Sequence, residues 1–463
     1  METKQNVMEP ALALARANRD ADLADLFEEL RIPSVSSLSV HEKDCLRNAE
    51  WLRARFQKMG MEAKVIDVVE GGLPIVMAEW LKRPGKPTLT MYGHYDVQPP
   101  DPLDEWKTPP FEPTVRDGHV YARGCADNKG NHMVCVKAAE HLFAAGGPPI
   151  NIRFLIEGEE EKSGYALPRY LRDNASRLKT DSVLIWDGGF DPAGRPTLAN
   201  ALRGIIYTEL NAVGAAVDLH SGEYGGNAPN PINTLAHIIS DLKDREGRIT
   251  IPGFYDDVQP ASAAELKEWA REDDTYAAIA LKLSGAPALE GEPGFMATER
   301  HGSRPTLDAN GIIGGFTGEG SKTVIPSRAM AKVSMRLVPN QDPEAITAAF
   351  KKYVQSLTTP GVKVTVTVLG SVSPPVLCGT DNPAAKALSA AYKETFGKFP
   401  ALERVGGSIP VAVDFQEALG APLVISGIPQ ADCAVHSPNE HLVIDQYHKG
   451  IEAIIRFICN LGA

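Results

Sequence analysis

The stretch Thr88-Leu89-Thr90-Met91-Tyr92-Gly93-His94-Tyr95-Asp96 indicates the fold most clearly. Its first five residues form an apolar run that predicts a buried strand. A histidine and an aspartate follow directly after that run. In an open α/β sheet, the loops that leave the carboxyl ends of strands converge on one crevice. The stretch therefore predicts a strand that delivers polar side chains to a functional site.

The same arrangement recurs along the chain. Apolar runs at residues 152–156, 183–186 and 423–425 also predict buried strands. The further polar clusters are Cys125-Ala126-Asp127-Asn128, Glu159-Glu160-Glu161, Asp187-Gly188-Gly189 and Val435-His436-Ser437. Two histidines and several carboxylates gathered in one crevice would form a metal pocket lined by oxygen and nitrogen. The pattern favours a metal-dependent hydrolase.

Composition excludes several other classes of protein. The chain has 463 residues, which suggests two or three domains. Its net charge is −12 and it has no basic tract, so a nucleic-acid partner is not expected. No apolar run approaches the roughly 20 residues of a membrane span. The six cysteines are scattered without a C-x-x-C pair, which predicts a reducing, cytoplasmic location.

The order of predicted elements suggests an α/β fold with an insertion. Residues 11–60 look helical, and strands then alternate with helices, including one at 129–145, as in a mostly parallel sheet. After residue 203 the character changes to that of an α+β module. Its predicted strands are 207–213, 331–338 and 362–369, and its predicted helices are 231–242 and 261–283. The alternation of helices and strands returns after Pro374-Pro375, and the chain ends in a predicted helix at 447–461. We expect a catalytic domain in two parts, 1–203 and 376–463, and an inserted lid and dimerisation domain at 204–375.

The strand-end loops supply enough ligands for two metal ions. Two divalent cations about 3.5–4 Å apart can share a bridging carboxylate and a bridging water. The available side chains are His94, Asp127, Glu160, Glu161, Asp187 and His436. Each alone has an ordinary explanation: a lone histidine or aspartate after a strand is commonly a capping or surface residue, and three adjacent glutamates can form a solvated loop. The combination is stronger because one crevice is expected for all of them.

Four motifs resemble the M20 metallopeptidases, and within them the carnosinase and cysteinylglycine dipeptidase branch. These motifs are Gly93-His94-Tyr95-Asp96, Gly124-Cys125-Ala126-Asp127-Asn128-Lys129-Gly130, Glu157-Gly158-Glu159-Glu160-Glu161 and His436-Ser437-Pro438-Asn439-Glu440. The resemblance continues through Asp218-Leu219-His220-Ser221-Gly222, Lys322-Thr323-Val324-Ile325-Pro326, Met335-Arg336-Leu337-Val338-Pro339 and Gly406-Gly407-Ser408-Ile409-Pro410. It covers nearly the whole chain in order.

The resemblance implies a role for each residue of the metal site. His94 and Asp187 would bind one metal, and Glu161 and His436 the other. Asp127 would bridge both, with a cis peptide bond to residue 128. Glu160 would be the general base, Asp96 would orient His94, and Glu159 would have no direct role. Zinc is the default ion for such a set, and manganese or cobalt fits the same ligands.

The remaining histidines and Cys125 look structural. His132 and His141 lie on a predicted helix, where packing or surface roles are expected. We expect the same of His119, His441 and His448. Cys125 precedes the proposed bridging aspartate, and we expect a small packed side chain there.

Several residues are candidates for substrate binding, and most of them lie in the inserted module. A substrate carboxylate suits the planar guanidinium of Arg336, whose alternative is an internal salt bridge. Ser408 and Gly407 lie in a loop whose N–H groups can help to hold that carboxylate. The resemblance also implies that Thr323 contacts the substrate and that His220 stabilises the oxyanion in the partner subunit of a homodimer. On sequence alone, His220 is equally an ordinary loop histidine.

The sequence leaves three candidate functions, and one departure from the family pattern helps to choose between them. The first is hydrolysis of dipeptides or short peptides with a free C-terminal carboxylate. The second is an N-acyl amino acid amidohydrolase or carboxypeptidase with the same machinery. Some dipeptidase relatives have a histidine-bearing loop where this chain reads Cys378-Gly379-Thr380-Asp381-Asn382-Pro383, and its absence favours the second. The third, a non-catalytic binding protein, would predict a missing ligand or base, and none is missing.

Overall fold

The computed structural model describes residues 2–162, 164–370 and 372–463, and the chain divides into two compact units. Unit 1 comprises residues 1–200, 378–403 and 411–463, and unit 2 comprises residues 201–377 and 404–410. The short segment 404–410 belongs to unit 2 although it lies between two segments of unit 1. Each unit has its own hydrophobic core.

A large twisted sheet with the strand order β1-β2-β6-β3-β7-β17-β8 forms the centre of unit 1. The strands are β1 (Glu62–Ile66), β2 (Ile75–Trp80), β3 (Thr88–His94), β6 (Asn151–Glu157), β7 (Ser182–Gly188), β8 (Thr197–Leu202) and β17 (Leu423–Gly427). The central neighbours β6, β3, β7 and β17 are parallel, whereas β1, β2 and β8 pair antiparallel. The α/β class with a mostly parallel central sheet is confirmed. β3, β6 and β7 are buried along most of their length, as strands covered on both faces must be.

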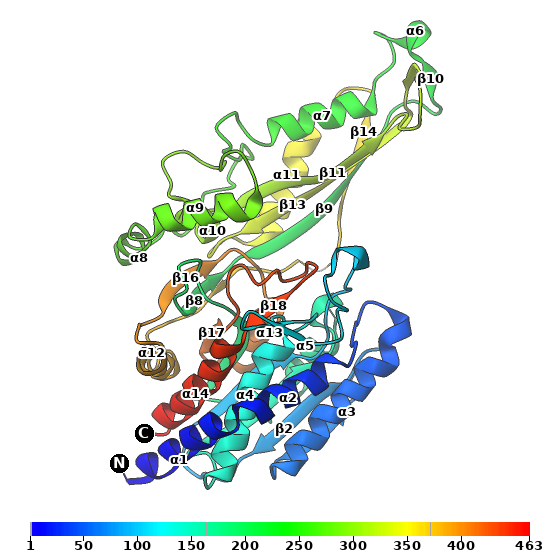
Figure 1. Cartoon of the computed structure of the whole chain (residues 1–463). Helices are drawn as coiled ribbons and strands as arrows, with labels where there is room; N and C mark the ends of the chain where they lie inside the picture. The colour runs from blue at the N-terminus through cyan, green and yellow to red at the C-terminus, as the bar shows by residue number, and fades with distance from the viewer. Residues whose placement is uncertain (1, 163, 371) are drawn as a thin grey trace. The chain divides into compact units, whose positions relative to one another are not determined.

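Helices cover the sheet of unit 1 (Figure 1). They are α1 (Glu2–Ala17), α2 (Arg19–Leu30), α3 (Glu42–Lys58), α4 (Lys129–Ala144), α5 (Ala166–Asn174), α12 (Pro383–Phe396), α13 (Pro410–Leu419) and α14 (Ile444–Leu461). α14 packs against α1, α4 and α12, and α4 packs against β3 and β7. The first predicted helical region is therefore three helices. It is interrupted at Asn18 and again at residues 31–41, where Pro33 lacks the N–H that a continuing helix needs.

Short elements complete unit 1. They are the 3₁₀ turns η1 (Ser39–His41), η2 (Leu103–Glu105) and η3 (Glu160–Lys162), and the strands β4 (Thr114–Arg116), β5 (His119–Tyr121), β16 (Ala401–Val405) and β18 (His441–Val443). β18, β5 and β4 form a small antiparallel sheet, and β16 pairs with β8. η3 places two of the predicted site residues directly after β6.

An antiparallel sheet with the order β11-β13-β9-β14 is the main feature of unit 2. Its strands are β9 (Gly204–Val213), β11 (Thr306–Gly314), β13 (Arg328–Leu337) and β14 (Lys363–Val368). Burial alternates along β9 and β13, which have one face on the core and one toward solvent, as the pattern at 207–213 predicted. Helices α7 (Pro231–Asp241) and α11 (Pro343–Leu357) pack on this sheet.

Unit 2 also contains several smaller elements. They are β10 (Leu219–His220), β12 (Val324–Ile325), β15 (Val376–Leu377), α6 (Ser221–Tyr224), α8 (Ala263–Trp269), α9 (Asp273–Ser284) and α10 (Ala297–Gly302). The single helix predicted at 261–283 is wrong, because two helices occupy that stretch. Ser262 and Glu265 form a capping box at the start of α8, and the acidic pair Asp273 and Asp274 opens α9, where the helix dipole favours negative charge.

Three helices share one start signal that is visible in the sequence. In α7, α11 and α12 an Asn or Asp side chain accepts a hydrogen bond from a backbone N–H of the first turn, and proline occupies the first helical position. The capping oxygen satisfies an N–H that has no partner within the helix, and proline already has the helical φ. These starts are therefore set locally.

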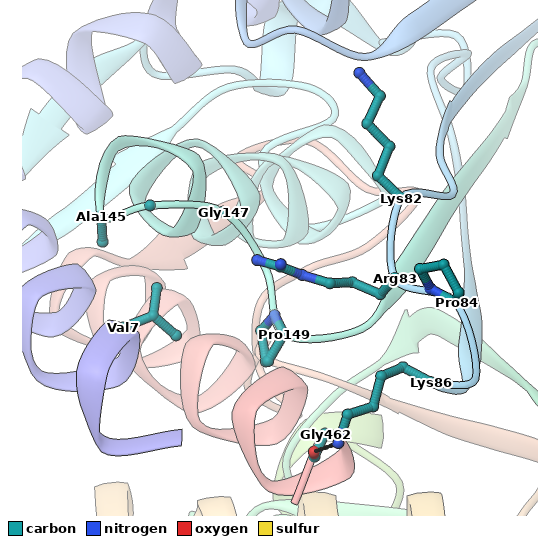
Figure 2. A pocket seen from close by; sticks show the side chains of 10 residues that line it. Val7, Lys82, Arg83, Pro84, Lys86, Ala145, Gly147, Pro149 and Gly462 are labelled. Atoms are coloured by element: carbon teal, nitrogen blue, oxygen red, sulfur yellow. Dashed lines mark hydrogen bonds between the residues drawn. The ribbon is translucent and has the colours of Figure 1, made fainter. Parts of the chain in front are cut away.

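Basic side chains lie where the C-terminal ends of α4 and α14 meet the loop after β2 (Figure 2). Lys86 Nζ donates to the carbonyl of Gly462 at 2.9 Å, and Arg83 Nε donates to the carbonyl of Pro148 at 2.9 Å. The last carbonyls of a helix carry partial negative charge, which cations stabilise. Lys86 therefore stabilises the C-terminal end of α14, whereas Arg83 holds the loop that follows α4.

Candidate metal centre

Three neighbouring parallel strands bring the predicted site residues together. His94 is the last residue of β3, Asp187 is the penultimate residue of β7, and Glu160 and Glu161 begin η3 directly after β6. Asp127 precedes α4, and His436 lies in the loop between β17 and β18. Because the carboxyl ends of parallel strands open on one edge of the sheet, side chains from distant parts of unit 1 converge there.

Asp127 lies between the two histidines. Its Oδ1 is 3.1 Å from His94 Nε2, and its Oδ2 is 3.0 Å from His436 Nε2. His94 Nε2 is also 3.7 Å from an Asp187 oxygen, and His436 Nε2 is 3.3 Å from Glu161 Oε2. Each oxygen of Asp127 therefore faces a different group of ligands, as a bridging carboxylate requires.

The donor atoms fit two divalent cations. His94, Asp127 and Asp187 offer ligand atoms within 4.8 Å of one another, and so do Asp127, Glu161 and His436. A third group joins His94, Glu160 and Glu161. The first two groups share Asp127, and their mixture of imidazole nitrogen and carboxylate oxygen suits zinc and also manganese or cobalt. All five predicted ligands and the predicted base thus lie in one cluster.

The ligands perturb one another's pKa strongly. Burial alone would raise the pKa of Asp127, but hydrogen bonds from His436 and His94 outweigh it and hold that pKa below its usual range. Hydrogen bonds to Asp127 and Glu161 raise the pKa of His436 to about 10. Burial opposes a charged His94, yet its contacts with Asp127 and Asp187 raise its pKa well above the usual value. The cluster is an alternating arrangement of acids and imidazoles that favours cationic occupants.

The pKa values of Glu160 and Asp187 are raised, in contrast to that of Asp127. Burial raises the pKa of Glu160 well above its usual value, and the negative charges of Asp187, Glu161 and Asp127 add to that rise against the opposing effect of His94. Burial also raises the pKa of Asp187. A carboxylate in such surroundings has a high affinity for a proton, which a general base needs.

Asp96 has a wider role than the sequence implied. Its main-chain oxygen is the nearest partner of His94 Nδ1, at 3.0 Å, while its carboxylate is 3.4 Å away. The carboxylate accepts hydrogen bonds from the N–H groups of Glu160 (3.3 Å) and Glu161 (3.1 Å) and from Ser36 Oγ (2.6 Å). Asp96 therefore orients the histidine and also holds η3, so two strand-end loops are linked through one side chain.

Sequence reasoning missed several supporting residues. Gln98 Nε2 donates to Glu161 Oε2 at 2.8 Å, and the Asn128 side chain donates to Asp187. Both lie within four residues of a predicted ligand, which was the available signal. The peptide bond between Asp127 and Asn128 is cis, as the resemblance implied. Glu159 accepts a hydrogen bond from Leu73 N at 2.9 Å, so it anchors its loop.

His132 and His141 have structural partners. His132 is buried; its Nδ1 lies 3.0 Å from the carbonyl of His94 and its Nε2 lies 2.9 Å from Glu29. His141 Nε2 pairs with Asp22 at 2.8 Å. The packing role expected for both is confirmed. Each ring also interacts with a buried carboxylate, Glu29 or Asp22. Cys125 is fully buried and small, also as expected.

The predicted substrate residues belong to unit 2. Arg336, on β13, donates from Nη1 to Ser408 Oγ at 2.9 Å, and Ser408 Oγ donates to the carbonyl of Arg203 at 2.6 Å. The carbonyl of Gly407 accepts from Arg203 N. Burial lowers the pKa of Arg336, and no carboxylate of the described residues forms a salt bridge with it. Burial, together with the nearby charge of Arg336, lowers the pKa of Arg203 to about 10. Two guanidinium groups thus lie close together, and Arg203 is a cation that sequence reasoning missed.

His220 and Thr323 are neighbours at the two-stranded antiparallel sheet formed by β10 and β12. His220 pairs with Val324, and Ser221 N donates to the carbonyl of Thr323 at 3.1 Å. Both side chains are exposed. His220 Nδ1 accepts a hydrogen bond from Gly222 N at 3.0 Å, which fixes the proton of a neutral ring on Nε2.

The sheet and the cluster at its edge define a hydrolase of the metallopeptidase class. The model of peptidase family M20/M25/M40 matches residues 90–460, and the chain belongs to this family. It is a peptide-bond hydrolase.

Characterised relatives match over most of their length. The Cys-Gly metallodipeptidase of Schizosaccharomyces pombe is 31% identical over 96% of this chain and 96% of its own. The human Beta-Ala-His dipeptidase is 31% identical over 84% of this chain and 78% of its own. Among solved structures, the metallo-carboxypeptidase Sso-CP2 of Sulfolobus solfataricus superposes with a TM-score of 0.84 at 34% identity, covering 95% of this chain and 99% of that one. In the part of this chain that the structure describes, no helix has the length and apolarity to span a membrane.

Proposed function

We propose that this protein hydrolyses the peptide bond of dipeptides or short peptides that have a free C-terminal carboxylate, using two divalent cations. The observation that carries the proposal is the placement of Asp127 between two ligand groups, with Glu160 beside both. Two of the relatives are dipeptidases by name, and each matches more than four fifths of this chain. Zinc is the favoured ion, with manganese or cobalt as alternatives.

The proposed reaction gives each residue of the cluster a task. Divalent cations held by these residues would supply Lewis acidity, which lowers the pKa of a bound water from about 15.7 toward neutrality. Glu160 accepts a proton from the attacking water and then delivers it to the leaving amine. Asp96 keeps the backbone of Glu160 and the ring of His94 in place. Asp187, Glu161 and His436 complete the ligand groups on either side of Asp127.

Arg336 is the proposed anchor for the substrate carboxylate. Among the described residues it has no carboxylate partner, and its side chain donates one hydrogen bond, to Ser408 Oγ, so the guanidinium retains donors for a two-pronged hydrogen bond. Ser408, Gly407 and Thr323 would supply further contacts. Arg203 adds positive charge near Arg336, and a bound carboxylate would relieve the repulsion between the two.

The proposed enzyme is a cytoplasmic homodimer in which His220 serves the partner's site. Within unit 2, β11 is an edge strand of its sheet, and its Ile312 and Ile313 side chains are 54% and 58% exposed. Exposed apolar side chains on an unpaired edge are a ready surface for association. Residues 204–375 would then be the lid and dimerisation domain. All six cysteines are free and buried, which suits a reducing compartment.

A second candidate is an N-acyl amino acid amidohydrolase or carboxypeptidase. It is favoured by two observations: the loop at residues 378–383 has no histidine, and the solved relative Sso-CP2 is a metallo-carboxypeptidase by name. The same metal cluster and the same carboxylate anchor would serve this reaction, because both substrates end in a free carboxylate. The two candidates differ only on the N-terminal side of the scissile bond.

A substrate panel with defined metals tests the proposal. Metal-free enzyme reconstituted with zinc, manganese or cobalt is assayed on free dipeptides, N-acetyl amino acids and longer N-blocked peptides. Preference for free dipeptides supports the first candidate, and preference for N-acyl substrates supports the second. Absence of metal-dependent turnover on every substrate would contradict both.

A further inference from the structure

The carboxylate of Glu440 is the centre of a buried group of hydrogen bonds next to the metal cluster. Oε2 accepts from Arg123 Nη1 at 2.7 Å and from Gly124 N at 2.9 Å. Oε1 accepts from Ala126 N at 2.8 Å and from Asp127 N at 3.0 Å. The residue is 0% exposed, so these four bonds replace all of its hydration. The loop that ends in Asp127 is therefore tied to one side chain.

Glu440 also belongs to the loop that carries His436. That loop is closed at its base, where His441 N donates to the carbonyl of Cys433 at 2.9 Å. Ala122 N donates to the carbonyl of Glu440, and β18 begins at His441 by pairing with Tyr121 on β5. Glu440 thus stands at a fixed base, four residues from His436, and its side chain reaches the other ligand loop.

We infer that Glu440 is a positioning residue that fixes Asp127 relative to His436, so that one carboxylate can serve two metal ions. The two loops are more than 300 residues apart in sequence. Apart from the contact between the ligands His436 and Asp127 themselves, the side chain of Glu440 joins them through hydrogen bonds from Ala126 N and Asp127 N. The inference rests on the proposed function, because it concerns the same pair of ions. Residues that hold ligands in place commonly contribute 10- to 100-fold to metal affinity, by order of magnitude.

The chemistry of the group requires a carboxylate at position 440. Four N–H donors point at two oxygens, and an amide in place of the carboxylate would direct its own N–H groups against one pair of donors. It would also leave the guanidinium of Arg123, which is 1% exposed, without its anionic partner. Burial raises the pKa of Glu440, and Arg123 with the backbone N–H groups opposes that rise.

A neighbouring residue provides a matched control. Asn439 anchors the same loop elsewhere: its Oδ1 accepts from Lys107 N at 2.9 Å and its Nδ2 donates to the carbonyl of Glu105 at 2.8 Å. It has φ +64°, which glycine adopts readily. Asn439→Gly therefore removes an anchor of the His436 loop without removing the hydrogen bond to Asp127.

The test compares metal binding by the wild type, Glu440→Gln, Glu440→Asp and Asn439→Gly. Each protein is stripped of metal, and its thermal unfolding is recorded to establish that it is folded. Zinc is then titrated against a competing chelator, and the absorption spectrum of the cobalt form reports the ligand geometry. We expect Glu440→Gln to bind zinc about 10- to 100-fold more weakly, with an altered cobalt spectrum, and Asn439→Gly to change less. We also expect excess zinc to restore part of the lost kcat while KM stays the same.

Glu440→Asp keeps the test decisive if the glutamine variant does not fold. It preserves the charge that pairs with Arg123, but it is one methylene shorter and does not reach all four donors, so we expect the same weakening. Wild-type zinc affinity and an unchanged cobalt spectrum in a folded Glu440 variant would overturn the inference while leaving the proposed function intact. A wild type that binds no divalent cation would overturn the proposed function, and this inference with it.

Discussion

The metal cluster of unit 1 and the substrate residues of unit 2 differ in how completely they are formed. In unit 1, His94 and His436 each contact Asp127 at about hydrogen-bond distance. Asp96 and Gln98 both form hydrogen bonds with Glu161. In unit 2, His220 and Thr323 are exposed at the small two-stranded sheet of β10 and β12. All the candidate ligands lie in unit 1, so we expect metal binding to depend on that unit alone. The proposed roles of His220 and Thr323 need a substrate or a second subunit as partner.

Removing the proposed base should have the largest effect and should separate the chemical step from metal binding. We expect Glu160→Gln to retain two cations while kcat falls roughly 10²- to 10⁴-fold, because the glutamine cannot accept the proton of the attacking water. Metal content by elemental analysis and steady-state kinetics on the best dipeptide would check this. Asp127→Ala is the matched contrast, since it should lose metal as well as activity. Near-wild-type turnover by Glu160→Gln would remove Glu160 as the base.

Removing the proposed oxyanion donor should cost less and should leave unit 1 intact. We expect His220→Ala to lower kcat about 10²- to 10³-fold with unchanged metal content, as for loss of one oxyanion-hole donor. Mixing it with Glu160→Gln under conditions of subunit exchange should restore about a quarter of wild-type activity, because half of the dimers are hybrids and each hybrid has one intact site. Mixing without recovery, in dimers shown to exchange, would contradict the trans arrangement.

The central strands and the order of the fold were predictable because their signals are local. The apolar run at 88–92 became β3, and the helix predicted at 129–145 became α4 (Lys129–Ala144). The helix at 261–283 failed because alanine, glutamate and lysine favour helix throughout, while the break is set by capping at Ser262 and by the acidic start of α9.

The sequence could predict the candidate metal ligands, but not the residues that hold those ligands in place. His94, Asp127 and Asp187 follow apolar runs or belong to motifs, so their side chains could be expected in one crevice. Contacts of Gln98 and Glu440 depend on how loops far apart in the sequence fold back, which no local pattern specifies. Periodicity cannot indicate that Asp96 serves two loops at once.

Altering Arg336, the proposed anchor of the substrate carboxylate, should affect substrate binding more than the chemical step. We expect Arg336→Lys to lower kcat/KM about 10- to 100-fold, mainly by raising KM, because an ammonium cannot form the two parallel hydrogen bonds of a guanidinium. A dipeptide amide should be a poor substrate for the wild type and should lose little more in the variant. An equal loss on both substrates would show that Arg336 does not contact the carboxylate.

The smallest expected effect is on stability and concerns unit 2 alone. Glu265 pairs with Arg404 at 2.8 Å; burial by itself would raise the pKa of Glu265, but the hydrogen bond from Arg404 outweighs it and lowers that pKa to about 2. A lowered pKa in the folded state stabilises the protein above the ordinary value of about 4.5, and this stabilisation is lost as pH falls toward 2. Thermal unfolding should therefore show Glu265→Gln less stable than wild type at pH 7, with a difference that shrinks below about pH 4.5. A difference that does not change with pH would assign the effect to packing.

The most direct test of the account is a crystal structure of the zinc-loaded enzyme, with the ions located by their anomalous scattering. The account predicts two ions per chain, about 3.5–4 Å apart, with one Asp127 oxygen on each. His94 and Asp187 should complete one site, and Glu161 and His436 the other. A single ion, or two ions that do not share Asp127, would contradict it.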